Sequence, residues 1–143
     1  MTVVVVAAVI EEQGRFLVTR RQAGVHLAGL WEFPGGKIDP DETHTDALRR
    51  ELREELDTDV SVGELVLATT HAYPEKTVTL YFYRCRLLSA ARPLLGQEMR
   101  WVDRDELRTL GFPAADEELI QVLAGKSDQP QRPVATKTGS QKD

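Results

Sequence analysis

The chain has 143 residues, a formal net charge of −5 and a pI of about 5.3. This length fits one domain that can bury a hydrophobic core without disulfides or structural metals. Cys85 is the only cysteine, which excludes an intramolecular disulfide and a cysteine metal cluster. The negative charge argues against a surface that binds a nucleic-acid backbone, but small nucleotides stay open as ligands because a metal ion can supply positive charge.

The N-terminal stretch is rich in valine and predicts a strand over residues 2–10 that is buried on both faces. It lacks a basic flank and runs directly into Glu11 and Glu12, so it reads neither as a signal peptide nor as a membrane span. We therefore expect a cytoplasmic protein with no membrane contact. A turn and a returning strand over residues 15–19 follow, and residues 22–30 predict a loop.

The stretch over residues 31–37 reads Trp-Glu-Phe-Pro-Gly-Gly-Lys and, taken alone, is typical of an irregular strand end. A helix is then predicted to begin after Thr43, whose side chain can cap it with Asp46 at the third helical position. The helix carries a leucine at every fourth position, which predicts a stripe facing the core: Leu48, Leu52 and Leu56.

Glu51, Glu54 and Glu55 stand at positions i, i+3 and i+4 of this helix, so their carboxylates share one face. Like charges at these spacings repel, and a hard divalent cation that prefers oxygen ligands would neutralise them. The pattern indicates a site for Mg²⁺, with Mn²⁺ as the other candidate. In isolation, the same run also fits a solvated helix face stabilised by charge pairs.

Strands are predicted over residues 60–62 and 64–73, the second forming a hairpin with a strand over residues 77–87. One face of this last strand carries Val78, Leu80 and Phe82, and the other carries Tyr81, Tyr83 and Cys85. We therefore expect Cys85 to pack in the hydrophobic core.

A brief strand over residues 99–102 precedes a short helix, capped by Asp103, that extends to about residue 110. A final helix follows Asp116. From residue 125 onwards Ser, Gln, Pro, Lys and Thr replace large apolar residues, which predicts a disordered tail over 125–143 after one domain over 1–124. The order of elements predicts an α/β (α+β) fold with a mixed sheet between helices.

Gly36, Glu42 and the run Arg50 to Glu55 together resemble the Nudix signature, G-x5-E-x7-R-E-U-x-E-E-x-G-U, where U is aliphatic. Asp57 and Thr58 depart from the last two positions. Since Asp tolerates the left-handed conformation that ends many helices, we expect Asp57 to replace that glycine. The preceding stretch W-E-F-P-G-G-K-I resembles the MutT-like branch of the family, which implies an α/β/α Nudix sandwich.

The resemblance implies a metal site and a catalytic helix. The expected catalytic residues are Arg50, Glu51, Glu54 and Glu55, and the expected metal ligands are the carbonyl of Gly35 with Glu51, Glu54 and Glu55. Arg50 would orient Glu51. For Glu42, an outer-sphere ligand and a salt bridge that orders the loop are equal alternatives. Relatives often carry an acid before Gly-Gln, where this chain has Leu95, and Glu98 is the candidate to replace it.

The resemblance also implies contacts to a nucleotide. The expected substrate-binding residues are Arg21, His26, Glu32, Phe33, Pro34, Gly35, Gly36, Lys37, Tyr73 and Asp116. Phe33 would stack on the base or wall it off, and Asp116 would bind the base or cap the final helix. The archetype of the branch has Asn in place of Asp116. An ionised Asp only accepts hydrogen bonds, which argues against strict preference for 8-oxo-dGTP and fits the cytosine amine or the guanine N1 and N2 hydrogens.

The implied function is a Mg²⁺-dependent nucleoside triphosphate pyrophosphohydrolase. It would release a nucleoside monophosphate and pyrophosphate from oxidised or surplus nucleotides such as 8-oxo-dGTP or (d)CTP, in nucleotide-pool sanitisation linked to DNA repair. The alternatives are a Nudix hydrolase of dinucleoside polyphosphates, nucleotide sugars or RNA 5′ ends, and a non-catalytic nucleotide-sensing module. No stable nucleic-acid binding is expected, and the chain is a monomer or a homodimer.

Overall fold

The computed structural model describes residues 1–25 and 27–125. His26 and the predicted tail beyond residue 125 lie outside the described residues. The last described helix includes Gly125, one residue past the predicted domain boundary.

The helices and strands follow closely the order expected from the sequence. They are β1 (Thr2–Glu12), β2 (Arg15–Arg20), β3 (Trp31–Glu32), β4 (Gly35–Lys37), α1 (His44–Leu56), β5 (Val60–Tyr73), β6 (Lys76–Leu87), β7 (Met99–Asp103), α2 (Arg104–Leu107), the 3-10 helix η1 (Ala114–Asp116) and α3 (Glu117–Gly125). No described helix has both the length and the apolar character needed to cross a bilayer.

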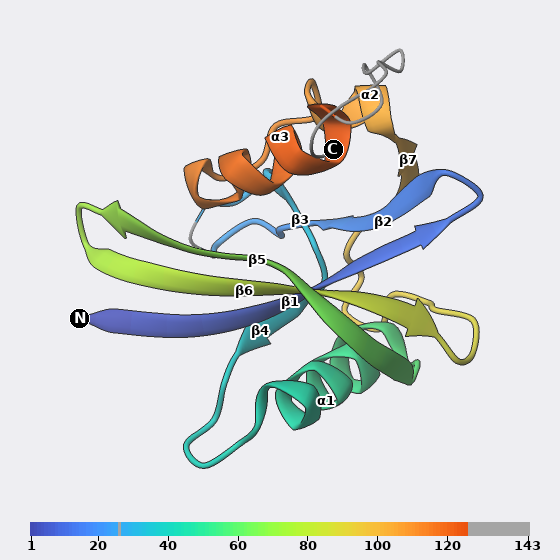
Figure 1. Ribbon diagram of the computed structural model, residues 1–143, viewed down its shortest axis with the longest axis horizontal. Helices are drawn as coiled ribbons and strands as arrows, with labels where there is room; N and C mark the ends of the chain where they lie inside the picture. Colours follow the sequence, from blue (N-terminus) through green and yellow to red (C-terminus); the bar gives the residue numbers. More distant parts are fainter. Residues whose placement is uncertain (26, 126–143) are drawn as a thin grey trace, which may run out of the picture.

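The sheet is mixed, as predicted. Its strand order is β3-β2-β1-β6-β5, with β4 also pairing with β1 and β7 with β2. The pair β1 and β6 is parallel, whereas β5 and β6 form the predicted antiparallel hairpin. Helix α1 lies on one side of the sheet and helices α2 and α3 lie on the other (Figure 1). The predicted arrangement of a mixed sheet between helices is therefore confirmed.

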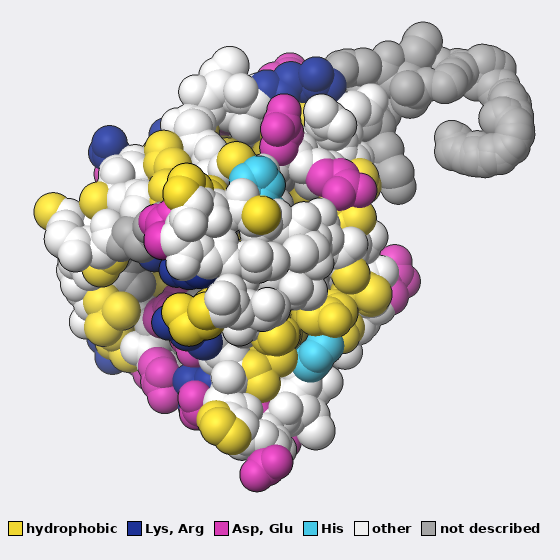
Figure 2. Space-filling model, turned by 90° about the vertical axis from the view of Figure 1, so that its left-hand side faces the viewer, with side chains coloured by type: hydrophobic (Ala, Val, Ile, Leu, Met, Phe, Trp, Pro, Cys, Tyr) yellow, Lys and Arg dark blue, Asp and Glu magenta, His cyan; other side chains and the backbone are white. Residues whose placement is uncertain are grey.

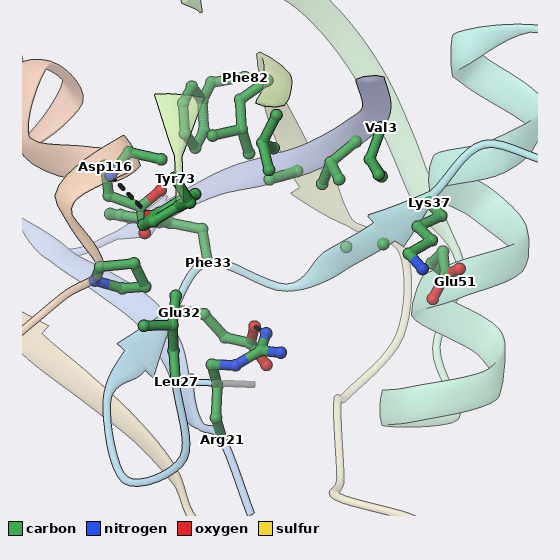
Figure 3. A pocket seen from close by; sticks show the side chains of 18 of the residues that line it. Val3, Arg21, Leu27, Glu32, Phe33, Lys37, Glu51, Tyr73, Phe82 and Asp116 are labelled. Carbon is green, nitrogen blue, oxygen red and sulfur yellow. Dashed lines mark hydrogen bonds and ion pairs between the residues drawn. The ribbon is translucent and has the colours of Figure 1, made fainter. Parts of the chain in front are cut away.

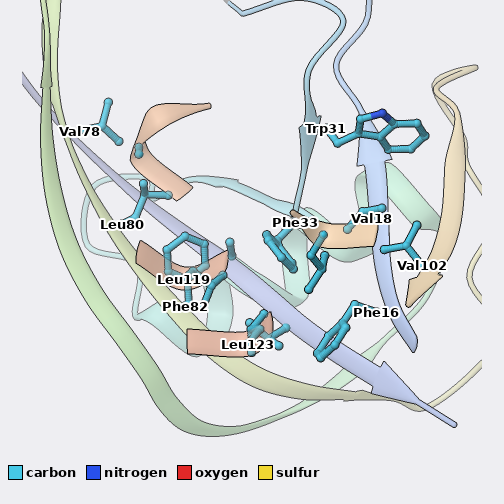
Figure 4. Packing of buried hydrophobic residues seen from close by; sticks show 14 residues of the cluster. Phe16, Val18, Trp31, Phe33, Val78, Leu80, Phe82, Val102, Leu119 and Leu123 are labelled. Atoms are coloured by element: carbon cyan, nitrogen blue, oxygen red, sulfur yellow. The ribbon is translucent and has the colours of Figure 1, made fainter. Parts of the chain in front are cut away.

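Strand β1 separates two hydrophobic clusters because its side chains alternate between the faces of the sheet. Ala7 and Val9 face the cluster under α3, which contains Phe16, Phe82 and Leu119 (Figure 4). Alternate residues of the same strand face the α1 side, where the predicted stripe of Leu48, Leu52 and Leu56 is fully buried with Cys85. The valine-rich strand is thus central and buried on both faces over residues 6–10, while residues 2–5 remain partly exposed.

Helix α1 has the predicted ends. The side chain of Thr43 accepts a hydrogen bond from the Asp46 N–H at 3.1 Å. At the other end Asp57 adopts the left-handed conformation, with φ 51° and ψ 41°, and its N–H reaches the Arg53 carbonyl. Asp57 therefore replaces the glycine of the Nudix pattern in the conformation that the sequence predicted.

The two main departures from the predicted elements concern β5 and the helix after Asp103. Residues 60–73 form one continuous strand, β5, whose pairing with β6 shifts between Val62 and Leu65 and again before Leu67. Gly63, which predicted a break between two strands, instead lies at a shift in the strand pairing, and the strand continues through it. The predicted helix after Asp103 ends at Leu107, and residues 108–110 are not helical.

Candidate active site

A cavity of 420 Å³ opens between α1, the first strands and η1. Figure 2 shows this face of the molecule, where acidic and basic side chains gather around a hollow bordered by hydrophobic ones. The cavity is lined by most of the residues that the sequence singled out: Arg21, Glu32, Phe33, Gly35, Gly36, Lys37, Glu51, Glu55, Tyr73 and Asp116. Arg50, Glu54, Glu42, Pro34 and Glu98 do not line it, and His26 lies outside the described residues.

The carboxylates of Glu51 and Glu55 lie against each other at one end of the cavity. Burial, the hydrogen bond and negative charge of Glu51, and the charge of Glu32 together raise the pKa of Glu55 to about 9. The backbone N–H of Gly35 donates to Glu55 and opposes these effects. Two carboxylates that share a proton in a buried site can exchange that proton for a metal cation.

Gly36 is required by the closeness of Glu51. A Cβ added to Gly36 would overlap the Glu51 carboxylate, so a larger residue would displace it from the cavity. Gly35 is packed as closely, since its added Cβ would overlap the Val6 carbonyl on β1. Both glycines of the loop therefore serve the close approach of backbone to neighbouring groups.

Arg50 forms hydrogen bonds to several acidic residues near the cavity. Its guanidinium donates to both oxygens of Glu42, at 2.7 and 2.9 Å, and to the Lys37 carbonyl at 3.1 Å. It also donates to Glu51 at 3.0 Å and to Glu54 at 3.3 Å. Arg50 is thus in position to orient Glu51, as the sequence indicated.

Glu42 is held in the loop before α1. The hydrogen bonds from Arg50 and from the Asp39 backbone together lower the pKa of Glu42 to about 2. Its carboxylate also accepts from the Asp39 N–H at 2.9 Å. These contacts match the loop-ordering salt bridge, one of the two alternatives for Glu42.

The oxygen donors of the predicted metal ligands suit a hard cation, although the three glutamates do not form one cluster. Within residues 1–25 and 27–125, no group of three or more His, Cys, Asp and Glu side chains forms a metal cluster. Glu54 is exposed and engaged by Arg50, while Glu51 and Glu55 point into the cavity. The carboxylate pair has the oxygen donors that Mg²⁺ and Mn²⁺ prefer, so these residues fit such an ion.

Asp116 lies at the other end of the cavity and is only 6% exposed. Burial and, to a lesser degree, the charge of Glu32 raise the pKa of Asp116 to about 7, against a smaller lowering by Arg21. Asp116 ends the 3-10 helix η1, which runs directly into α3. Its side chain faces the cavity, and Asp116 itself lies within η1, whose N-cap is Pro113, which argues against the N-cap alternative.

Phe33 forms a wall of the cavity. It is 4% exposed, stacks on Phe112 at 5.3 Å between ring centroids and meets Phe82 edge-on at 6.1 Å. The Tyr73 hydroxyl accepts from the Ala115 N–H at 3.0 Å and so joins the β5–β6 hairpin to η1. In Figure 3 Phe33, Tyr73 and Asp116 gather at one end of the cavity, and Lys37 and Glu51 lie at the other.

Arg21 and Glu32 lie between these two ends and form an ion pair at 2.6 Å. Burial raises the pKa of Glu32, and the charge of Arg21 opposes that increase.

Two predicted residues contribute elsewhere. The carbonyl of Pro34 accepts from the Ala8 N–H at 2.8 Å and anchors the loop to β1. Glu98 pairs with Arg20 at 3.4 Å at an exposed site, so the structure does not bring it into the cavity as a replacement acid.

The cavity also contains residues that sequence reasoning missed. Leu27, Lys76, Pro113 and Ala115 line it. Lys76 begins β6 directly after the hairpin turn that follows Tyr73, so the predicted hairpin was the available signal for it. Leu27 and the Pro113 segment come from loops, where periodicity carries no information about orientation.

Comparison with known proteins places this geometry in a family. A NUDIX domain model matches residues 5–122. The CTP pyrophosphohydrolase of Escherichia coli is 56% identical over 62 residues, which cover 43% of this chain and 46% of that protein, less than half its length. The 8-oxo-dGTP diphosphatase of Haemophilus influenzae is 35% identical over 117 residues, 81% of this chain and 86% of that protein. The solution structure of the E. coli ORF135 protein superposes with a TM-score of 0.77 at 33% identity, covering 92% of this chain and 95% of that one. The chain belongs to the Nudix family.

Proposed function

We propose that this Nudix hydrolase cleaves nucleoside triphosphates into a nucleoside monophosphate and pyrophosphate. The observation that carries the proposal is that one cavity joins the Glu51 and Glu55 pair to a buried polar group, Asp116, beside the aromatic wall of Phe33. The carboxylate end suits a metal-bound triphosphate, and the other end suits a base. The names of the relatives, a CTP pyrophosphohydrolase and 8-oxo-dGTP diphosphatases, support this assignment.

The acidic end of the cavity would hold Mg²⁺ or Mn²⁺ through Glu51 and Glu55, with Glu54 and the Gly35 carbonyl as the remaining predicted ligands. A divalent cation there supplies positive charge to the phosphate oxygens and the leaving group. The protein contributes the orientation of the ligands: Arg50 holds Glu51.

Asp116 is proposed to read the base in two protonation states. With a pKa of about 7, a neutral carboxyl group coexists with the carboxylate near neutral pH. The neutral form donates and accepts hydrogen bonds, as an amide does, while the ionised form only accepts. An ionised Asp116 would disfavour 8-oxo-dGTP, but burial keeps part of the Asp116 population neutral, so both 8-oxo-dGTP and (d)CTP are candidate substrates.

A substrate panel tests the proposed function. We expect the purified full chain with Mg²⁺ to release pyrophosphate from at least one of 8-oxo-dGTP, dGTP, dCTP, CTP and 5-methyl-dCTP. The measurement is pyrophosphate release with chromatographic identification of the nucleoside monophosphate. A higher kcat/KM for nucleotide sugars or dinucleoside polyphosphates than for every triphosphate would overturn the proposal.

Replacement of Asp116 by Asn should abolish a pH dependence of both stability and base preference. The folded-state pKa of Asp116 lies above its unfolded value, so the contribution of Asp116 to the free energy of unfolding falls as the pH rises from about 4 to 7 and is level above that range. Because Asn has no charge to bury, the free energy of unfolding of the variant should exceed that of the wild type by about 2 to 4 kcal/mol at about pH 8. At about pH 4 the two should be almost equal. Urea unfolding at several pH values measures the difference.

In the same variant, the preference between bases should no longer change with pH. In the wild type, the ratio of kcat/KM for 8-oxo-dGTP to that for dCTP should change between about pH 6 and pH 8, and in Asp116→Asn it should stay level. Asp105→Asn is the matched control, since Asp105 is exposed on α2. An unchanged pH profile in Asp116→Asn would contradict the assignment.

A further inference from the structure

The segment between β6 and β7, residues 88–98, contains no helix or strand but is bonded closely to the C-terminal end of α1. The last carbonyls of a helix have no partners within the helix and need donors from elsewhere. Here the Arg92 N–H donates to the Leu56 carbonyl at 2.9 Å. The Leu94 N–H and the Gln97 Nε2 both donate to the Glu55 carbonyl, at 2.9 and 3.1 Å.

Gln97 completes this arrangement with both ends of its amide. While its Nε2 donates to the Glu55 carbonyl, its Oε1 accepts from the Leu95 N–H at 2.9 Å. Gln97 as a residue is 9% exposed, so each of these bonds replaces a bond to water that the buried amide has lost. An amide is the side chain that can both donate and accept at this reach.

The two positions that depart from the Nudix signature belong to the same arrangement. The Asp57 carboxylate accepts from the Arg92 guanidinium at 2.8 Å. The Thr58 hydroxyl, which is buried, donates to the Ser89 carbonyl at 2.7 Å. Glycine and an aliphatic residue have no side-chain polar group for either bond. The departures therefore tie the 88–98 segment to the helix end.

The residue whose carbonyl is held twice is Glu55, which lines the cavity beside Glu51. Helix ends fray most readily, and fraying of the last turn would carry Glu55 away from Glu51. A small displacement of a catalytic group is enough to lower turnover strongly. We infer that Gln97 is a positioning residue that, through the Glu55 carbonyl, keeps the last turn of α1 and the Glu55 side chain in place for the reaction. This inference rests on the proposed function.

The test compares Gln97→Met, which keeps the length of the side chain but removes both hydrogen bonds, with the wild type. We expect kcat to fall about tenfold with KM within about twofold, because the substrate contacts stay intact while a catalytic ligand loses its position. Hydrogen exchange of the amides of residues 55–58 and 94, measured without substrate, should become at least about tenfold faster. Gln97→Glu, which keeps the acceptor for Leu95 but loses the donor to Glu55, should show the same loss of kcat.

Arg92→Ala is the matched control. It removes an ion pair from the same segment, but the Arg92 side chain is 73% exposed and its partner is Asp57. Its kcat and its exchange near Glu55 should stay within about twofold of the wild type.

Unchanged kcat and exchange in Gln97→Met, or restoration of kcat by Gln97→Glu, would overturn the inference. An equal loss in Arg92→Ala would do so too, since it would show a general effect of loosening the segment. Should the wild type cleave no nucleotide, the proposed function fails, while the exchange measurement still decides whether Gln97 holds the helix end.

Discussion

Replacing Glu55 by Gln should lower kcat for the preferred triphosphate by about 10³-fold or more, since the neutral amide cannot replace a carboxylate beside the metal ion. The change should leave the fold intact. Burial and Glu51 raise the pKa of Glu55 to about 9, so without metal the folded protein already carries a neutral Glu55 at neutral pH. The unfolded chain ionises this group and is thereby favoured, so the metal-free variant should unfold at a higher temperature than the wild type.

Thermal unfolding with and without Mg²⁺ separates the roles of charge and fold. Mg²⁺ should raise the unfolding temperature of the wild type, because binding to the folded state stabilises it, and should have much less effect on Glu55→Gln. Chelation with EDTA should abolish turnover by the wild type. Glu64→Gln, at an exposed position of β5, is the control and should keep activity and the Mg²⁺ effect. Turnover by Glu55→Gln near the wild-type rate would refute the proposed ligand set.

The second large effect is expected for Arg50→Lys, with a loss of about 10²-fold in kcat and a small change in KM. Lysine keeps the positive charge, but one ammonium group cannot span Glu42, the Lys37 carbonyl and Glu51 as the guanidinium does. Glu51 would lose its orientation while the base end of the cavity stays unchanged. Steady-state kinetics on the preferred triphosphate measure the effect.

The neighbouring residue offers a closely matched control for this change. Arg49 makes a two-bond pair with Asp59, at 3.1 and 2.9 Å, but it is not a lining residue of the cavity. Arg49→Lys should therefore lower the unfolding temperature by an amount similar to Arg50→Lys while keeping kcat within about twofold. A similar loss of kcat in both variants would show that the effect of Arg50 is structural.

Several parts of the site could be predicted from the sequence because they depend on the spacing of residues within one helix. The Thr43 cap, the buried leucines and the Glu51 and Glu55 pair follow from the capping pattern and the 3.6-residue period of one helix. The same period could not distinguish Glu54 from Glu55, since both lie on the acidic face. In the fold, Glu55 lies against β4 in the cavity, and Glu54 points outward to Arg50.

Burial likewise decided the chemistry of Asp116. Its position before α3 suggested either a cap or an ionised base contact. The packing of η1 against the β5–β6 hairpin, through Tyr73 and Ala115, removes Asp116 from water and raises its pKa. No local pattern reports this, because the enclosing residues come from distant parts of the chain.

The sequence by itself determined the family signature, the class of fold and the central strand, since caps, periodicity and signature spacing act over a few neighbouring residues. Only the tertiary structure decided that Glu98 lies outside the cavity, that Lys76 and Leu27 lie inside it, and that Gln97 holds the end of α1. The physical reason is that burial, charge coupling and loop contacts depend on elements brought together by folding, and loop orientation leaves no periodic trace in the sequence.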